Sequence, residues 1–296
     1  MTGAIQDILA ERARIVRAMR AFFDGRGFVE VETAVRIPAP APEEHIDCPP
    51  CRDGGYLRAS PELQMKKLLA AGMDKIYQIG PCFREGERGS RHNPEFTMIE
   101  WYRRDATYRD IAEDLKSLLN ELASSPSCLS RPACRPDGSL ASITTLSVRD
   151  AYRRFAGWDP WVGDWDQDRF DFDMATKIEP AIKATGGGVF LVDYPPQAAS
   201  LAKVADGVAE RWEFYWDGLE LANCFTELCD EGEQRRRFAA AKANRAALSE
   251  LDYPLDEEFL ASLPRIGSAS GVALGVDRLV VVLTGAKEIA SVRAPT

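Results

Sequence analysis

The sequence lacks long hydrophobic runs and clusters of basic residues, and each shortage excludes a class of protein. Its longest uncharged stretches, such as residues 266–276, run to about eleven residues, whereas a transmembrane helix needs about 20. No five Lys or Arg residues occur in a row, and 46 acidic against 37 basic residues give a net charge of −9. Proteins that bind nucleic acids through phosphates usually carry the opposite bias. We therefore expect neither a membrane span nor a nucleic-acid-binding surface.

The sequence also has few features of an exported or metal-binding protein. Charges of both signs interrupt residues 1–16, so no signal-peptide core is present and a cytoplasmic location is expected. The seven cysteines are odd in number and lie in a chain too long to need disulfides, which favours free thiols. Cys48 and Cys51 have CxxC spacing, but two prolines separate them and only two histidines exist as further ligands. A metal site at these thiols is disfavoured.

The 296 residues, 45% of them hydrophobic, suffice for one large core. Apolar spacing predicts helices over residues 5–25, 61–71, 108–123 and 231–250. Alternation predicts strands over 28–33, 75–84, 96–103 and 189–193, a hairpin over 211–228, and a strand continuing as a helix over 271–283. Residues 124–142 have little periodicity, which indicates an excursion or linker. Hairpins without a βαβ rhythm predict an α+β fold in one domain.

One loop between predicted strands concentrates arginine. Residues 83–96, FREGERGSRHNPEF, contain Arg84 and Arg91, and the arginine fork suits phosphate oxygens. Taken alone, a solvated charged hairpin explains this loop equally well.

Two further segments carry patterns of chemical interest. Glu213, Glu220 and Glu227 surround a predicted turn and can converge, in which case a metal ion or an ammonium group must neutralise them. Residues 270–279, SGVALGVDRL, alternate small side chains before Arg278, so a ligand can approach the backbone. The alternative for the three glutamates is that they are surface residues. The alternative for the small residues of 270–279 is ordinary core packing.

In this order, the segments resemble motifs of the class II aminoacyl-tRNA synthetases. FREGERGSRHNPEFTMIEWY is similar to motif 2, SGVALGVDRL to motif 3, and residues 22–33 to motif 1, which forms the dimer interface of that class. RHNPEFT, ELANCFTEL and ASPELQMKKLL narrow the resemblance to the lysyl branch, over nearly the whole chain. It implies the class II catalytic fold, an antiparallel sheet flanked by helices, and a homodimer formed through the motif 1 region.

Lysyl-tRNA synthetases also carry an N-terminal anticodon-binding barrel, whereas here the motif 1 helix begins near residue 5. We therefore expect residues 1–296 to form a single catalytic domain that lacks the barrel and does not use tRNA. Domains of this kind resemble the elongation factor P lysine ligases. The resemblance implies activation of lysine or (R)-β-lysine by ATP as an acyl-adenylate, then transfer to a lysine side chain of elongation factor P. The alternatives are an enzyme that loads another carrier or amine, and a catalytically silent paralogue.

The resemblance also implies a role for individual residues. ATP would contact Arg84, Glu85, Glu87, Arg91, His92, Asn93, Phe96, Glu220, Leu221, Gly275 and Arg278, with Arg84 and Arg278 as the catalytic pair. Mg²⁺ would bind Glu213 and Glu220. The lysine-type substrate would contact Ser60, Pro61, Glu62, Glu100, Tyr102, Asn223, Phe225, Glu227 and Ala273. An ordinary buried ion pair is the structural alternative for the carboxylates of Glu62 and Glu100.

Three positions depart from the lysyl synthetase pattern. Gly86 replaces the Glu of the motif 2 Arg-x-Glu, so Glu87 is expected to contact adenine instead. Ala34 replaces the proline of motif 1, which predicts a local change in the dimer contact. Ala273 replaces a glycine, and its methyl group would favour a β-amino over an α-amino substrate by roughly 1–3 kcal/mol.

Overall fold

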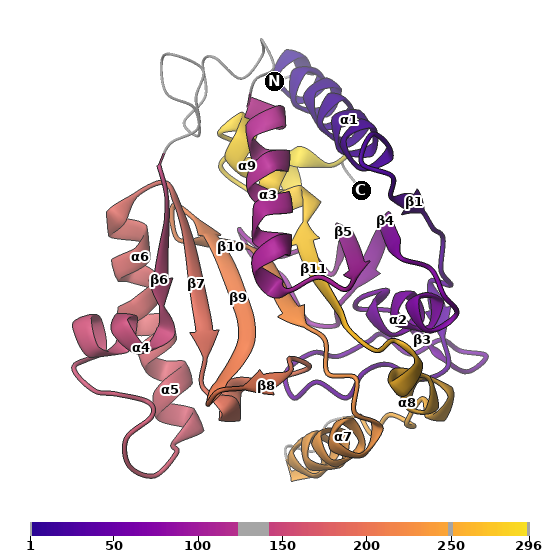
Figure 1. Cartoon of the computed structure of the whole chain (residues 1–296). Helices are drawn as coiled ribbons and strands as arrows, with labels where there is room; N and C mark the ends of the chain where they lie inside the picture. The colour runs from indigo at the N-terminus through magenta and orange to yellow at the C-terminus, as the bar shows by residue number, and fades with distance from the viewer. Residues whose placement is uncertain (1, 124–141, 248–250, 295–296) are drawn as a thin grey trace.

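A mixed β-sheet forms the centre of the molecule. The computed structural model describes residues 2–123, 142–247 and 251–294 (Figure 1). The sheet strands are β1 (Val29–Glu30), β4 (Lys75–Phe83), β5 (Glu95–Arg104), β6 (Ile143–Ser147), β7 (Gly188–Tyr194), β8 (Val204–Ala205), β9 (Val208–Trp216), β10 (Leu219–Thr226) and β11 (Ala269–Gly275). Their order is β1-β4-β5-β11-β10-β9-β7-β6, with β8 paired to β9. A separate ribbon pairs β2 (Arg36–Ile37) with β3 (Tyr56–Leu57).

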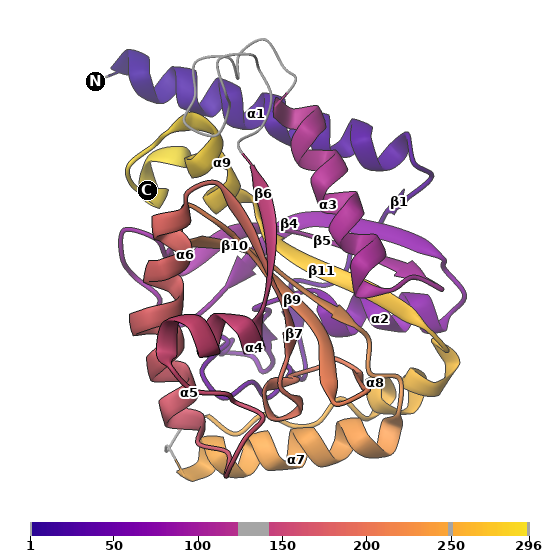
Figure 2. The ribbon, with the colours of Figure 1, turned by 60° about the vertical axis from the view of Figure 1, so that its left-hand side comes forward.

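The helices are α1 (Thr2–Asp24), α2 (Glu62–Ala70), α3 (Tyr108–Ala123), α4 (Val148–Ala151), α5 (Gln167–Asp173), α6 (Glu179–Thr185), α7 (Glu231–Ala247), α8 (Glu257–Ser262) and α9 (Val276–Thr284). α1, α3 and α9 share the largest hydrophobic core with one face of the sheet, and α4, α5 and α6 lie beside β6 and β7 (Figures 1 and 2). None of the described helices is long and apolar enough to cross a membrane.

Strand alternation assigns the sheet residues to two faces. Trp101, Val272, Leu274 and Phe214 point toward α1, α3 and α9 and are at most 1% exposed. Because successive side chains point to opposite faces, the residues between them on β5, β11 and β9 lie on the other face. That face carries the polar and small residues of the candidate site.

Apolar patterning predicted most of the described elements. The four predicted helices are confirmed as α1, α2, α3 and α7, although residues 248–250 lie outside the described part. The predicted strands, the hairpin and the strand–helix unit are confirmed as β4, β5, β7, β9 with β10, and β11 with α9. The α+β class is confirmed, and the sheet is mixed because β1 runs parallel to β4 and β6 runs parallel to β7. The interpretation of residues 124–142 falls almost entirely on residues that the structure does not describe.

The predicted half-buried strand over residues 28–33 is wrong. Only Val29 and Glu30 pair with β4, and both are exposed. The chain then leaves the ladder, because the backbone N–H of Thr33 donates to the side chain of Gln78 rather than to a strand carbonyl. No pattern predicted the lobe of β6 and α4 to α6, since two π-helical turns, Tyr152–Ala156 and Met174–Ile178, interrupt its helical period.

Candidate active site

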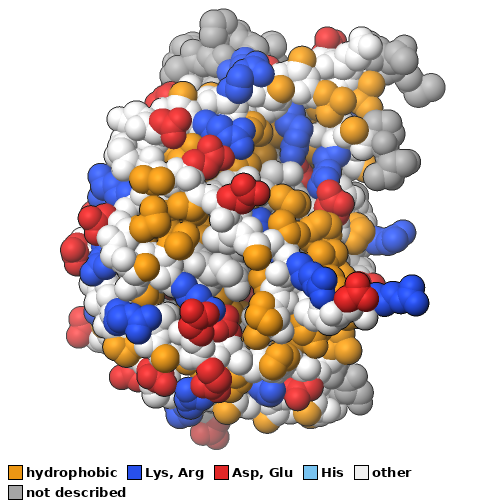
Figure 3. All heavy atoms as spheres, turned by 90° about the vertical axis from the view of Figure 1, so that its right-hand side faces the viewer, with side chains coloured by type: hydrophobic (Ala, Val, Ile, Leu, Met, Phe, Trp, Pro, Cys, Tyr) orange, Lys and Arg blue, Asp and Glu red, His pale blue; other side chains and the backbone are white. Residues whose placement is uncertain are grey.

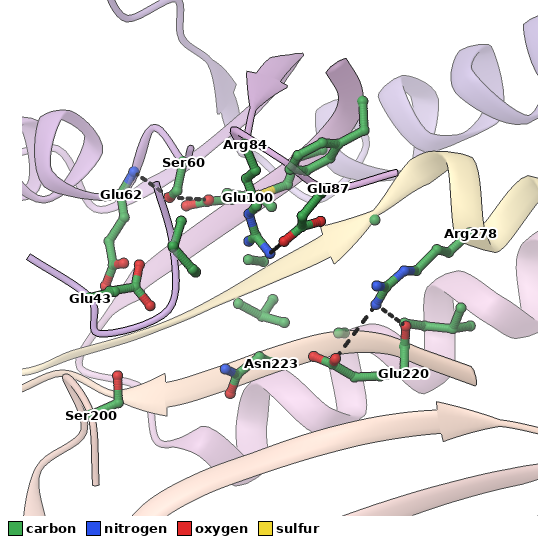
Figure 4. A pocket seen from close by; sticks show the side chains of 18 of the residues that line it. Glu43, Ser60, Glu62, Arg84, Glu87, Glu100, Ser200, Glu220, Asn223 and Arg278 are labelled. Carbon is green, nitrogen blue, oxygen red and sulfur yellow. Dashed lines mark hydrogen bonds and ion pairs between the residues drawn. The ribbon is translucent and has the colours of Figure 1, made fainter. Parts of the chain in front are cut away.

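A cavity of about 570 Å³ opens over β5, β11 and β10, on the face away from α1, α3 and α9 (Figure 4). The strand register explains its lining. Ala273 lies opposite Glu100 on β5 and Asn223 on β10, and Asn223 lies opposite Glu213 on β9. The adjacent row on the same face consists of Tyr102, Gly271, Phe225 and Arg211. Four strands thus bring residues that are up to 173 positions apart in the chain to one surface.

At one end of the cavity, a buried lysine contacts two carboxylates. Lys66, on α2, is 2% exposed, and its Nζ lies 2.5 Å from Glu62 Oε1 and also contacts Glu227 Oε2. Burial alone would lower the pKa of Lys66, but the carboxylates of Glu227 and Glu62 outweigh it and the pKa is raised. Lys66 is therefore charged, and the alternative of an ordinary buried ion pair holds for Glu62, whose partner is Lys66.

Glu100 adds a third carboxylate to the same end. It is 1% exposed and accepts hydrogen bonds from Ser60 Oγ at 2.6 Å and from the Tyr102 hydroxyl at 2.8 Å. Burial and the neighbouring Glu62 raise its pKa to about 7, against the effect of these two hydrogen bonds. Burial likewise raises the pKa of Glu227, while Lys66 opposes the rise. This acidic end, formed by Glu62, Lys66, Glu100 and Glu227, holds one cation for three carboxylates and suits a cationic ligand.

The opposite end of the cavity is basic. Arg278, in the first turn of α9, donates to the Glu220 carbonyl at 2.8 Å, and its second terminal nitrogen lies 2.8 Å from His92 Nε2. Burial and the charge of Arg278 lower the pKa of His92, which favours a neutral ring that accepts this hydrogen bond. We call the group of Arg84, His92 and Arg278 the basic end.

Arg84 begins the loop between β4 and β5 and lies on the side of the basic end that faces Glu100 and Glu62 (Figure 4). Its guanidinium lies 5.2 Å from the centroid of the Phe96 ring and 3.5 Å from Glu87 Oε1. Its buried Nε has no hydrogen-bond partner within the described residues. Gly86 has a φ of +73°, a backbone conformation that suits glycine and that L residues rarely adopt. Glu87 lines the cavity and Glu85 does not, in keeping with the expected shift of the contact from position 86 to Glu87.

The three carboxylates expected to converge divide into two groups. Glu213 accepts hydrogen bonds from Arg211 at 2.5 Å and from Tyr215 at 2.6 Å, and it lines an adjoining cavity of about 900 Å³ together with Glu220. A register shift between Glu220 and Ala222 lets Glu220 share this face. Desolvation and Glu213 raise the pKa of Glu220. Glu227 belongs instead to the acidic end.

The pair of Glu213 and Glu220 fits a divalent cation, because Glu213 makes ionisation of Glu220 more costly and both side chains offer hard oxygen ligands. Among the described residues, however, no three His, Cys, Asp or Glu side chains are arranged to hold a metal ion by themselves. Cys48 and Cys51 are free thiols. An ion at the two glutamates would need its remaining ligands from bound phosphate or water.

The small residues of β11 are small for different structural reasons. A Cβ atom on Gly271 would lie 2.1 Å from Cδ1 of Tyr102, so glycine is required there by the tyrosine ring and not by a ligand. Ala273 and Gly275 line the cavity, and a Cβ on Gly275 would meet only ordinary contacts. Gly271 also lines the cavity, and the approach of a ligand to the β11 backbone stays a prediction.

Most of the residues selected from the sequence line this cavity: Ser60, Glu62, Arg84, Glu87, Arg91, His92, Asn93, Phe96, Glu100, Tyr102, Glu220, Leu221, Asn223, Phe225, Glu227, Ala273, Gly275 and Arg278. Pro61, which precedes α2, Glu85 and Glu213 do not. Sequence reasoning missed Glu43, Lys66 and Arg211. The spacing of Glu62 and Lys66, four apart on a helix, was the one available signal for an ion pair.

Comparison with known proteins gives consistent matches. The family model for class II tRNA synthetases (D, K and N) matches residues 1–294. The elongation factor P (R)-β-lysine ligase of Proteus mirabilis is 36% identical, over 97% of this chain and 94% of that protein. The protein of the same name from Photorhabdus laumondii is 36% identical, over 99% of this chain and 95% of that protein. The one from Pectobacterium atrosepticum is 37% identical, over 97% of this chain and 94% of that protein.

Proposed function

The chain belongs to the class II tRNA synthetase (D, K and N) family, and from this premise we propose that it is an ATP-dependent ligase that joins (R)-β-lysine or lysine to a lysine side chain of elongation factor P. One observation carries the proposal. The cavity is acidic at one end and basic at the other, so an amino acid with two ammonium groups and the phosphates of ATP each meet opposite charge.

In the first reaction, a carboxylate oxygen of the amino acid attacks the α-phosphorus of ATP. The bond from that phosphorus to the oxygen bridging to the β-phosphate breaks, and pyrophosphate leaves. Such a step needs positioning and charge stabilisation more than a protein nucleophile. Arg84 is assigned to the α-phosphate and the substrate carboxylate, because it lines the cavity on the side of the basic end that faces the acidic end. Arg278 is assigned to adenine and the γ-phosphate.

The rest of the ATP site is assigned to the loop and strands around the basic end. Phe96 and Glu87 would hold adenine, and the remaining contacts are assigned to Arg91, His92, Asn93, Leu221, Gly275 and Glu220. Mg²⁺ bound by Glu213 and Glu220 would neutralise phosphate charge. Neutral His92 would accept a hydrogen bond from Arg278 and keep that guanidinium over the site.

The substrate side chain is assigned to the acidic end. Glu227 and Glu100 would bind its ammonium, Tyr102 and Ser60 would hold Glu100 in place, and Asn223, Phe225 and Ala273 would form the wall. In the second reaction, the neutral amine of the acceptor lysine attacks the carbonyl carbon of the adenylate. An amide bond forms, AMP leaves, and the amine loses a proton.

We further propose that the acceptor is a protein rather than tRNA, which agrees with the net charge of −9. A second copy of the chain is proposed to bind at α1 and β1. β1 is an edge strand, and its Val29 is 52% exposed. Figure 3 shows that this side of the molecule displays hydrophobic side chains between charged ones. Analytical ultracentrifugation of the wild type and a Val29→Glu variant tests this contact.

The test of function is a single reaction. The protein is incubated with ATP, Mg²⁺, (R)-β-lysine and the elongation factor P of its own organism, and the factor is weighed by intact-protein mass spectrometry. We expect the mass of the factor to increase by one lysyl group, and only when ATP is present. Lysine-dependent exchange of pyrophosphate into ATP without modification of the factor would indicate another carrier or amine. Absence of both would indicate a silent paralogue.

A further inference from the structure

The loop of residues 43–47 reaches the cavity from outside the sheet and is held there by a buried arginine. Arg245, on α7, is 1% exposed, and it donates to the carbonyl of Glu43 at 2.6 Å and to Asp47 Oδ1 at 2.5 Å. A charge-assisted network of this kind fixes the backbone position of the loop. The Glu43 backbone is therefore anchored, while its side chain is turned to the cavity.

The Glu43 carboxylate lies at the boundary between the two cavities and lines both. It lies beside Glu62 in Figure 4. Within the described residues, no hydrogen bond or ion pair involves its carboxylate oxygens. Burial and the charge of Glu62 raise its pKa more than Arg84, Arg211 and Lys66 lower it. A carboxylate that faces another carboxylate without a partner is costly unless a cation joins it.

A second observation points to a cationic ligand at the same place. Glu227 is 3% exposed, and its Oε1 has no hydrogen-bond partner among the described residues, although Oε2 contacts Lys66. With Glu43 included, four carboxylates face one buried ammonium at this end of the cavity. Lys66 already contacts two of them, so a ligand with two ammonium groups matches the remaining charge better than a ligand with one.

We propose that the Glu43 carboxylate binds the substrate ammonium group nearest to the reacting carboxylate, which makes Glu43 a specificity-determining residue for diamino acids. Glu43 and Arg84 line the same cavity, and Arg84 is the residue assigned to the reacting carboxylate, so the nearer ammonium is the one assigned to Glu43. This inference rests on the proposed ligase function, and it goes beyond that function by adding a residue from outside the sheet.

The test compares two ligands on two variants. (R)-β-lysine carries both ammonium groups, and 6-aminohexanoic acid keeps only the distant one. Glu43→Gln should raise KM for (R)-β-lysine in pyrophosphate exchange by about 10- to 100-fold, the usual effect of one charged hydrogen bond. The same variant should leave inhibition of exchange by 6-aminohexanoic acid unchanged. Glu32→Gln removes an exposed carboxylate earlier in the chain and should behave as wild type.

Glu43→Asp, which keeps the charge, should recover part of the affinity. An unchanged KM for (R)-β-lysine in Glu43→Gln, or an equal loss for both ligands, would overturn the proposal, provided that thermal unfolding and KM for ATP match wild type. Calorimetric titration of the two ligands into each variant needs no catalysis. It therefore reports on Glu43 even if wild type shows no exchange, an outcome that would count against the ligase proposal alone. A wild type that binds neither ligand would overturn both.

Discussion

The two ends of the cavity differ in exposure. At the acidic end, the exposed fraction is 1–3% for Lys66, Glu100 and Glu227. At the basic end, the exposed fraction of the side chain is 25% for Arg84 and 21% for Arg278. The acidic end contains its own counter-ion, with contacts of 2.5 Å or less. The basic end has carboxylate contacts of 3.5 Å, from Arg84 to Glu87 and from Arg278 to Glu220. The difference indicates that the acidic end is preorganised by the fold, while the basic arginines have loose partners that a polyphosphate can replace.

The largest loss is expected from the acidic end, at Glu227. Glu227→Gln leaves Lys66 with one carboxylate and removes a charge from the substrate site, so lysine-dependent pyrophosphate exchange should fall by about a thousandfold. Glu258→Gln is the matched control, because its side chain is 81% exposed and pairs with Lys67 at the surface. Retention of exchange by Glu227→Gln would show that the acidic end does not select the amino acid.

A smaller loss is expected at the basic end. Arg278→Lys keeps the charge but cannot contact both Glu220 and His92 with a planar fork, so kcat of exchange at saturating lysine should fall by about a hundredfold. Arg265→Lys makes the same change at an exposed position. If Arg278→Lys reduced exchange more than Glu227→Gln, the basic end would be the more strictly organised of the two.

Ala273 lies in the row between the two ends and tests selectivity rather than rate. Removing its methyl group with Ala273→Gly should shift the ratio of kcat/KM for (R)-β-lysine over α-lysine toward α-lysine by about 30-fold, as expected for one methylene-sized contact. The ratio is measured in exchange with each amino acid. An unchanged ratio would rule out the methyl group as the discriminating feature.

The smallest effect concerns protonation at the acidic end. Glu100 has a pKa raised to about 7 by burial and Glu62, so it is protonated below that pH and must lose its proton to bind an ammonium group. KM for lysine should therefore fall by about tenfold as the pH rises from 6 to 8. Glu100→Gln should weaken binding and leave only the part of this profile that is due to Glu227, whose pKa burial raises to about 8. A wild-type KM that is equal at pH 6 and 8 would contradict the assignment of Glu100.

The sequence pattern predicted the site residues that lie on the strands of the sheet. The other site residues are positioned by tertiary contacts, which the pattern does not show. The hairpin of β4 and β5 and the unit of β11 and α9 follow from alternation and period, so Glu100, Ala273 and Arg278 fall where the motifs placed them. Glu43 was out of reach, because its position depends on a contact with Arg245 about 200 residues away. The separation of Glu227 from Glu213 was also missed, because Glu213 pairs with Asn223 while Glu227 follows the end of β10, where it contacts Lys66.

The position of β11 also constrains the order in which the molecule can assemble. It is the last strand of the described sheet in sequence, yet it lies between β5 and β10 at the centre. Until residues 269–275 have been synthesised, the sheet consists of two halves whose inner edges have no partner, a state that exposes backbone hydrogen-bonding groups. Joining the two halves of the sheet requires contacts between residues far apart in the chain, and such contacts form slowly. A growing chain therefore acquires its cavity in one late step, and truncation before β11 should abolish ligand binding completely rather than by degrees.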